Sequence, residues 1–274
     1  MKRSEIHFPP QHEALREDVH ALGELIGQIL LDQGGPQLLE LVEQDRVVAI
    51  RRREGDAQAG IELATRVQGR PPAQARDLVR AFSMWFQAVN LAENVHRIRR
   101  RREYFLKDSK QPQPGGVQDA LASLRRQGLT LEEVLDLLGT LSIEPVFTAH
   151  PTESTRRTIL RKRQHVARLL FQRLDPTLTP NETRAIWGQI RTELTAGWQT
   201  EDHPRERLTV ADEREHVLFY LIEILYRVVP AFYDELAQAL ETVYGVAAES
   251  LQLPNILHFA SWVGGDMDGN PNVD

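Results

Sequence analysis

The sequence contains no cysteine. This absence excludes disulfide bonds, thiolate nucleophiles and cysteine-based zinc sites, and it is typical of a protein from a reducing compartment. The sequence also lacks an uninterrupted run of 18 apolar residues, and its N-terminal stretch has no apolar segment of the kind found in signal peptides. We therefore expect a cytoplasmic protein without a membrane-spanning segment.

An excess of positive charge is absent too. The 33 lysines and arginines are outnumbered by 39 aspartates and glutamates, which gives a formal net charge of −6. This balance argues against a protein dedicated to nucleic acids. The run Arg99–Arg102 has no aromatic residues between its arginines, so we interpret it as the solvated end of a helix.

Apolar residues recur at spacings of three and four along most of the 274 residues, as expected for helices. The pattern that begins near Leu15 stops at Gly34–Gly35, where a helix would end, and a second helix is predicted from Pro36 to about Arg53. Further helices are expected at about 78–95, 130–139, 153–173, 181–198 and 212–247.

The helix predicted to begin near residue 130 has sequence signals at both of its ends. Thr130 and Glu133 match a capping box, in which each side chain bonds the backbone of the other residue. Gly139 is expected to end this helix. The signals predict a short helix about ten residues long.

Strand signals are few. The two best are the short apolar segments 144–149 and 256–263, which are separated by roughly a hundred residues of helical pattern. The fold class predicted is mostly α with a few parallel strands. Functional groups gather at the C-terminal ends of the strands in parallel barrels, so we expect the loops after the two segments to face one another.

The first of these loops combines a histidine with several features that favour anions. Residues 146–157 read VFTAHPTESTRR, so His150 follows the strand directly. Pro151 suits the first position of a helix, whose free N–H groups would then lie near the imidazole, and Arg156 and Arg157 add positive charge. The pattern indicates a phosphate or carboxylate site; the alternative is a buried histidine bonded to backbone groups.

The second loop, GGDMDGNPNVD at 264–274, alternates acidic and amide residues among its glycines. An EF-hand calcium loop needs glycine at its sixth position, where this sequence has Pro271. Calcium binding is therefore not predicted. A turn held by hydrogen bonds from aspartate and asparagine side chains remains compatible with any function.

Both loops resemble motifs of a known family. VFTAHPTESTRRTIL and SWVGGDMDGNPNVD are similar to the two N-terminal motifs of phosphoenolpyruvate carboxylase, and GWQTEDHPRERLTVADE resembles the segment between them. The resemblance implies the N-terminal part of a helix-rich (β/α)8-like barrel that is incomplete in this chain. Residues 1–140 would form a helical layer, and residues 141–274 would carry the first two barrel strands with long helical insertions.

The resemblance also implies a reaction. Members of the family carboxylate phosphoenolpyruvate with bicarbonate, giving oxaloacetate and phosphate, and thereby fix carbon dioxide to refill the tricarboxylic acid cycle. Bicarbonate attacks phosphorus to give carboxyphosphate and an enolate, and the enolate captures the carbon dioxide that carboxyphosphate releases. Mg2+ or Mn2+ is the expected cofactor. His150 matches the base that takes the carboxyphosphate proton, and Trp262 matches a residue of the apolar substrate pocket.

Regulation is implied by the same likeness. Arg156 and Arg157 match residues linked in some members to a sugar-phosphate activator site. Arg205, in the segment between the two motifs, is a near neighbour that could also bind the activator. Two positions depart from the family pattern: Met267 stands where an arginine is usual, and Pro204 replaces a common arginine. The first departure removes one cation and with it any role of that side chain, and the second implies that the activator site is altered or absent.

Family members are several times longer than this chain, and their metal-binding carboxylates lie in parts that it does not have. We therefore expect an N-terminal fragment that is inactive alone, has no metal site of its own, and comes from a homotetrameric parent. The alternative is a helical anion-binding or regulatory module that keeps the His150 pocket without turnover.

Overall fold

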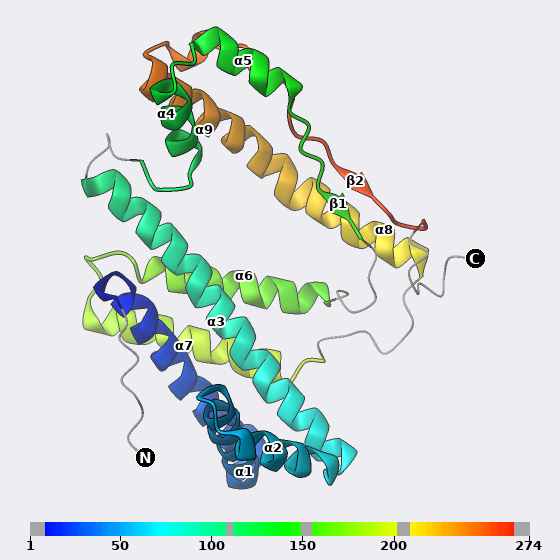
Figure 1. Cartoon of the computed structure of the whole chain (residues 1–274). Coiled ribbons are helices and arrows are strands. Elements are labelled where there is room, and N and C mark those ends of the chain that lie inside the picture. The colour runs from blue at the N-terminus through cyan, green and yellow to red at the C-terminus, as the bar shows by residue number, and fades with distance from the viewer. Residues whose placement is uncertain (1–8, 108–111, 149–154, 202–208, 266–274) are drawn as a thin grey trace. The chain divides into compact units, whose positions relative to one another are not determined.

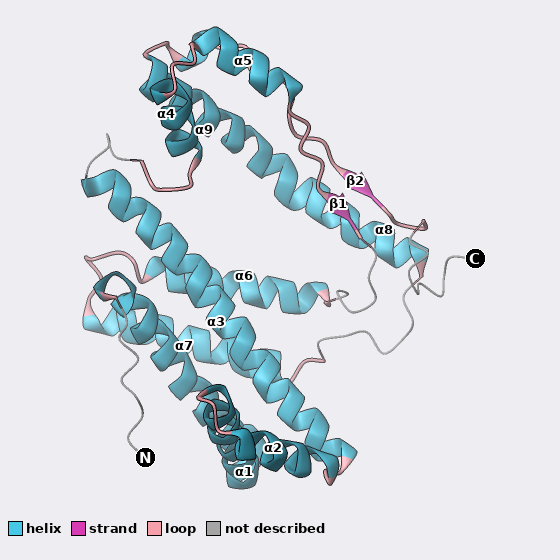
Figure 2. Cartoon of the chain, in the orientation of Figure 1, coloured by secondary structure: helices cyan, strands magenta, loops and turns pink. Residues whose placement is uncertain are grey.

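The computed structural model describes residues 9–107, 112–148, 155–201 and 209–265. It is mostly helical, at 77%, with two short strands (Figures 1 and 2). The chain divides into two compact units, each assembled from two stretches of sequence. Unit 1 comprises Met1–Arg100 and Arg157–Asp202, and unit 2 comprises Arg101–Arg156 and His203–Asp274. The predicted mostly helical chain with parallel strands is confirmed.

Unit 1 is helical throughout its described part. A short turn, η1 (Pro10–His12), leads into the first long helix. The helices are α1 (Glu13–Arg53), α2 (Ala57–Gln68), most of α3 (Pro72–Lys107), α6 (Arg157–Gln172) and α7 (Pro180–Trp198). All five helical regions predicted for this unit are present, and α3 is longer at both ends than the apolar stripe that predicted it.

The break predicted at Gly34–Gly35 lies inside α1. Gly35 has φ 78° and ψ 173°, which no helical residue adopts, and the helix resumes with Pro36. Proline suits the first turn of a helix because its missing N–H would have no partner there. Gly35 therefore separates α1 into the two helical segments that the sequence predicts.

Leucine, isoleucine and valine side chains from α1, α3, α6 and α7 form the core of unit 1. Leu22, Ile29, Leu170 and Ile190 are almost completely buried. Burial of each such side chain stabilises the fold by about 1.5–3 kcal/mol. Packing of these apolar faces therefore contributes far more to the stability of the helices than their intrinsic propensity does.

A buried carboxylate on α1 connects three helical segments of unit 1. Asp18 is 4% exposed and accepts hydrogen bonds from Arg99 of α3, at 2.7 Å, and from Arg173 just after α6, at 2.5 Å. The interpretation of Arg99–Arg102 as a solvated helix end is wrong for Arg99, whose side chain is only 18% exposed. The reason is that α3 continues to Lys107, so Arg99 lies within the helix and points toward α1.

Unit 2 contains shorter helices and the strands. Its elements are α4 (Val117–Arg126), α5 (Leu131–Thr140), β1 (Val146–Phe147), α8 (Val210–Phe219), the π-helical turn η3 (Tyr220–Leu225), α9 (Tyr226–Tyr244), η4 (Ala248–Ser250) and β2 (Ala260–Ser261). The capping box of Thr130 and Glu133 is present at the start of α5. The helix runs on to Thr140, one residue beyond the predicted end at Gly139.

The core of unit 2 lies between α4, α5 and α9. Leu121, Val134, Leu240 and Ile256 are buried there, and the half-buried Tyr233 donates a hydrogen bond to Asn255. The backbone N–H of Ile256 in turn donates to the Tyr233 hydroxyl at 2.9 Å. These contacts fix the segment that leads into β2 against α9.

The two strands pair in parallel, as the sequence predicts. Val146 lies opposite Ala260, and Phe147 lies opposite Ser261. An isolated bridge between Ile143 and Leu257 extends the same alignment toward the N-terminal ends of the strands. The strands are shorter than the predicted segments, but their direction and partnership agree with the prediction.

The helices α8, η3 and α9 form one continuous helical stretch, Val210–Tyr244. By length and composition this stretch of 35 residues could cross a membrane, and only 6% of its most apolar part is buried. Core helices of soluble proteins also meet this criterion, and the stretch contains an ion pair between Arg227 and Glu223. The absence of a membrane-spanning segment thus stays a prediction.

Candidate functional site at the strand ends

The C-terminal ends of β1 and β2 lie beside one another because the strands are parallel. The backbone N–H of Trp262, the first residue after β2, donates to the carbonyl oxygen of Phe147 at 2.9 Å. The N–H of Ala260 similarly donates to Pro145 at 3.2 Å. The hydrogen-bond ladder therefore continues to the point where both motif-bearing loops begin.

Trp262 starts a tight turn that redirects the chain after β2. The N–H of Gly265 donates to the Trp262 carbonyl oxygen at 2.9 Å, and Gly264 has φ 73°, a conformation that favours glycine. A Cβ atom at Gly264 would lie 3.5 Å from the side chain of Val210, at the start of α8. The turn leaves the Trp262 residue 54% exposed, so its indole has open surface for a ligand or another part of the protein.

Aromatic side chains of α8 and η3 pack beside β1. The ring of Tyr220 stacks on the ring of Phe147, with centroids 6.0 Å apart and planes inclined by 27°. The imidazole of His216 contacts the Tyr220 ring edge-on, with centroids 5.1 Å apart. Sequence reasoning did not select these residues. What marks them in the structure is the π-helical turn that begins at Tyr220, because such turns are frequent at functional sites. This turn has no simple sequence pattern, so the sequence did not indicate it.

The structure describes only part of the predicted site. Trp262, Arg156 and Arg157 are described, whereas His150, Arg205 and the departures Met267 and Pro204 lie outside the described residues. Arg156 is half-buried and belongs to unit 2, while Arg157 is exposed and begins α6 in unit 1.

The helix after β1 begins later than the sequence predicts. Its predicted start was about residue 153, but α6 begins at Arg157, and Pro151 lies outside the described residues. Thr155 and Arg156 precede α6 and are not helical. The N–H groups at the start of α6 therefore belong to residues that follow the TAHP sequence by several positions.

The sequence matches a known family over nearly its whole length. The family described as phosphoenolpyruvate carboxylase matches residues 15–274. The chain belongs to the phosphoenolpyruvate carboxylase family. Its similarity to the motifs of that family, inferred above from the residues alone, is thereby confirmed.

Individual phosphoenolpyruvate carboxylases show the same relationship. One from Xanthomonas campestris pv. campestris is 50% identical over 273 residues, and one from Xanthomonas oryzae pv. oryzae is 49% identical over 272 residues; each match covers 99% of this chain and 30% of the relative. One from Rhodothermus marinus is 36% identical over 261 residues, which are 94% of this chain and 28% of the relative. The chain thus spans about 30% of the length of the first relatives and corresponds to an N-terminal portion of a phosphoenolpyruvate carboxylase.

The described residues do not fit a metal site. Nowhere in the described ranges do three histidine, aspartate or glutamate side chains lie together so that they could hold an ion. The structure therefore assigns no ligands of Mg2+ or Mn2+ within the described ranges.

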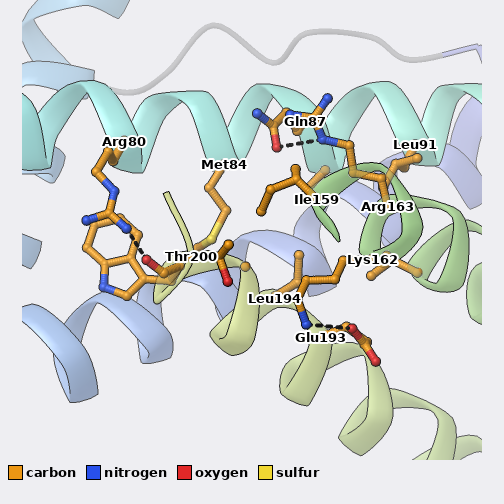
Figure 3. Close-up of a pocket in the computed structure, with 14 residues that line it drawn as sticks. Arg80, Met84, Gln87, Leu91, Ile159, Lys162, Arg163, Glu193, Leu194 and Thr200 are labelled. Carbon is orange, nitrogen blue, oxygen red and sulfur yellow. Dashed lines mark hydrogen bonds and ion pairs between the residues drawn. The ribbon is translucent and has the colours of Figure 1, made fainter. Parts of the chain in front are cut away.

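A separate pocket lies within unit 1, between α3, α6 and α7 (Figure 3). Its cavity volume is about 50 Å³, which is room for a few water molecules. Apolar side chains form much of its lining, among them Met84, Ile159 and Leu194. Neither Trp262 nor Arg156 nor Arg157 lines this pocket, so it is distinct from the strand-end site.

The cations of the pocket have partners within the protein, as Figure 3 shows. Arg163 donates to the Gln87 amide oxygen at 3.1 Å, and Lys162 lies 3.4 Å from Glu193. The Arg80 guanidinium donates to the Trp198 carbonyl oxygen and lies over its ring. Because the rim is held by these contacts, a ligand larger than water would have to displace side chains.

Proposed function

We propose that this chain supplies the strand-end part of the active site in a phosphoenolpyruvate carboxylase, which converts phosphoenolpyruvate and bicarbonate into oxaloacetate and phosphate. The observation that carries the proposal is the parallel pairing of β1 with β2. This pairing joins the starts of the two family motifs through the Trp262–Phe147 backbone hydrogen bond. Loops that start at the same edge of a sheet can act on one substrate.

Within this site His150 is the proposed base. In the sequence it stands three positions after Phe147, the last residue of β1. An imidazole can take the carboxyphosphate proton near neutral pH, and this transfer assists release of carbon dioxide next to the enolate. Trp262 is proposed to shield the reacting carbon from water, because its large indole is half-exposed at the end of the neighbouring strand.

The remaining properties are proposed for the whole carboxylase. Residues 1–140 would form a helical layer, and residues 141–274 would provide the first two strands of a (β/α)8-like barrel. Mg2+ or Mn2+, held by residues outside this chain, would stabilise the enolate. Arg156, Arg157 and Arg205 would bind a phosphorylated activator, since guanidinium groups match phosphate oxygens. The complete enzyme would be a cytoplasmic homotetramer.

A chimera tests the proposed function. Residues 1–274 are joined to the portion of the X. campestris carboxylase that they do not match, and oxaloacetate is measured by coupled reduction to malate. We expect bicarbonate-dependent oxaloacetate from the chimera and none from the 274-residue chain, because the carboxylates that bind the metal in this family are expected outside the chain. A purified chain that makes oxaloacetate, or a folded chimera that makes none, would contradict the proposal.

A further inference from the structure

The pocket of unit 1 between α3, α6 and α7 carries an excess of positive charge. Among the described residues, its charged lining consists of three cations and one carboxylate: Arg80, Lys162, Arg163 and Glu193. The carboxylate is already shared, because Glu193 lies 3.4 Å from Lys162 and 3.0 Å from His165. A concave surface with cations in excess attracts anions. The lining therefore favours a negatively charged ligand.

Arg80 is the cation of this pocket that is best placed to receive an anion. One of its terminal nitrogens donates to the carbonyl oxygen of Trp198, and its guanidinium carbon lies 4.7 Å from the centroid of the Trp198 ring. Within the described ranges no aspartate or glutamate pairs with Arg80, and its other two nitrogens donate no hydrogen bond. A half-buried guanidinium with two such nitrogens suits a carboxylate, which can accept both bonds at once.

The pocket also offers room and apolar contacts. Gly197, next to Trp198, is half-buried, and outside its own stretch of α7 a Cβ atom there would meet nothing within 4 Å. Met84, Ile159 and Leu194 line the pocket, and Figure 3 shows them between Arg80 at one end and the two other cations at the opposite end. Apolar walls of this kind favour a ligand with an aliphatic part.

We infer that this pocket binds a short aliphatic monocarboxylate, whose carboxylate is held by Arg80 and whose chain lies against Met84, Ile159 and Leu194. The cavity volume of about 50 Å³ is room for a few water molecules, which limits the ligand to about three or four carbon atoms. A ligand of drug size needs roughly 300 Å³ or more. The site goes beyond the proposed function, because all of its lining residues belong to unit 1.

Entry of the ligand requires the rim of the pocket to open. The contact between Lys162 and Glu193, at 3.4 Å, is longer than the hydrogen bond from Arg163 to Gln87, at 3.1 Å. An ion pair between partly exposed side chains contributes little to stability, and the ammonium group of lysine stands on a flexible stem. We therefore expect Lys162 to move aside when the ligand enters, while Glu193 keeps its contact with His165.

Titration of the 274-residue chain with propionate tests the inference, with binding measured by saturation-transfer difference NMR. We expect saturable binding with a dissociation constant of about 0.1–10 mM, as is reasonable for so small a ligand. Propionamide has nearly the same shape but no charge, and inorganic phosphate has charge but no aliphatic part. Each should bind at least about ten-fold more weakly than propionate.

Two substitutions locate the propionate site, and each has a matched control. Gly197→Val fills the open space, whereas Gly188→Val adds the same side chain at an exposed position of the same helix, where a Cβ atom also meets nothing. Arg80→Gln removes the proposed anchor. Arg76→Gln removes an exposed arginine of α3 that pairs with Asp77 and does not line the pocket. We expect propionate affinity to fall by about ten-fold or more in both pocket variants and to stay unchanged in both controls.

The inference fails if propionate shows no saturable binding, or if propionamide binds as tightly as propionate. It also fails if Gly197→Val binds propionate as wild type does, or if Gly188→Val loses binding to the same extent. Circular dichroism of the four variants establishes that each is folded before binding is compared. Because binding is measured without turnover, the result is independent of the proposed carboxylase reaction.

Discussion

At the scale of single residues, the helices of unit 1 depend on buried aspartates. Asp45, on α1, is 4% exposed and accepts hydrogen bonds from Arg70 at 2.6 Å and from Arg66 at 2.8 Å. Burial raises the pKa of this carboxyl group, but the bonds from the two guanidinium groups outweigh burial and leave the pKa below its ordinary value of 3.8. The ionised carboxylate is therefore the form that the folded protein holds.

Asp45→Asn should lower the free energy of unfolding by about 3–5 kcal/mol at neutral pH, because it leaves two guanidinium groups without their buried partner. Glu43→Gln is the matched control on the same helix. Within the described ranges Glu43 pairs with Arg46 alone, and both side chains are more than 40% exposed, so a loss of about 0–1 kcal/mol is expected. Urea unfolding of the two variants measures the difference.

The dependence of stability on acid pH, compared between wild type and Asp45→Asn, provides a check. A carboxylate whose pKa is lowered by folding stabilises the protein fully above its unfolded pKa, and this stabilisation is lost as the pH falls through the folded pKa. The difference between wild type and Asp45→Asn should thus be constant from neutral pH down to about 4 and shrink below that. A difference that grows in acid would rule out the ionised Asp45 as its source.

At the scale of elements, Gly35 determines the course of α1. Its φ of 78° is one that residues with a Cβ atom rarely adopt, although a Cβ atom there would meet nothing within 4 Å. Gly35→Ala should therefore destabilise unit 1 by about 1–2 kcal/mol through backbone strain alone. Thermal unfolding followed by circular dichroism measures the loss.

Gly139→Ala is the control for this change. Gly139 is an exposed residue in the last turn of α5 with open space around its Cα, so alanine should stabilise the helix by up to about 1 kcal/mol. Opposite signs for the two substitutions are the expected outcome. A Gly35→Ala variant as stable as wild type, or more stable, would mean that the break at Gly35 does not require a left-handed conformation.

Much of this element structure is predictable because its signals are local. The Thr130–Glu133 capping box, the break at Gly35 and the apolar stripes all depend on residues a few positions apart. The parallel partnership of residues 144–149 and 256–263 was predicted from the position of the strands between helices, and the structure confirms it.

The missed features depend on contacts between distant segments. Asp18 and Asp45 lie among the apolar positions of their helix, where an acidic residue signals a buried ion pair, but their arginine partners are not evident from spacing. The start of α6 at Arg157 was missed because Pro151 is an acceptable first residue for a helix. The predicted roles of His150, Trp262 and the arginines stay predictions.

At the scale of the whole molecule, the chain is one portion of a larger carboxylase. Its two units have separate apolar cores, which account for the stability of the described helices. The described part of the strand-end site belongs to unit 2, and the site needs further parts of the carboxylase to become complete under our proposal. Folding and catalysis are therefore expected to depend on different parts of the sequence, with His150 needed for the second only.

The most direct test of this account is the ratio of oxaloacetate to phosphate produced by His150→Asn in the chimera with the X. campestris portion. Asparagine cannot take the carboxyphosphate proton, so oxaloacetate formation should fall by about 100-fold to 10,000-fold. Bicarbonate-dependent phosphate release should continue, because attack on phosphorus precedes that proton transfer. His20→Asn, at an exposed histidine of α1, should leave both products unchanged. An unchanged ratio of the two products in His150→Asn would contradict the account.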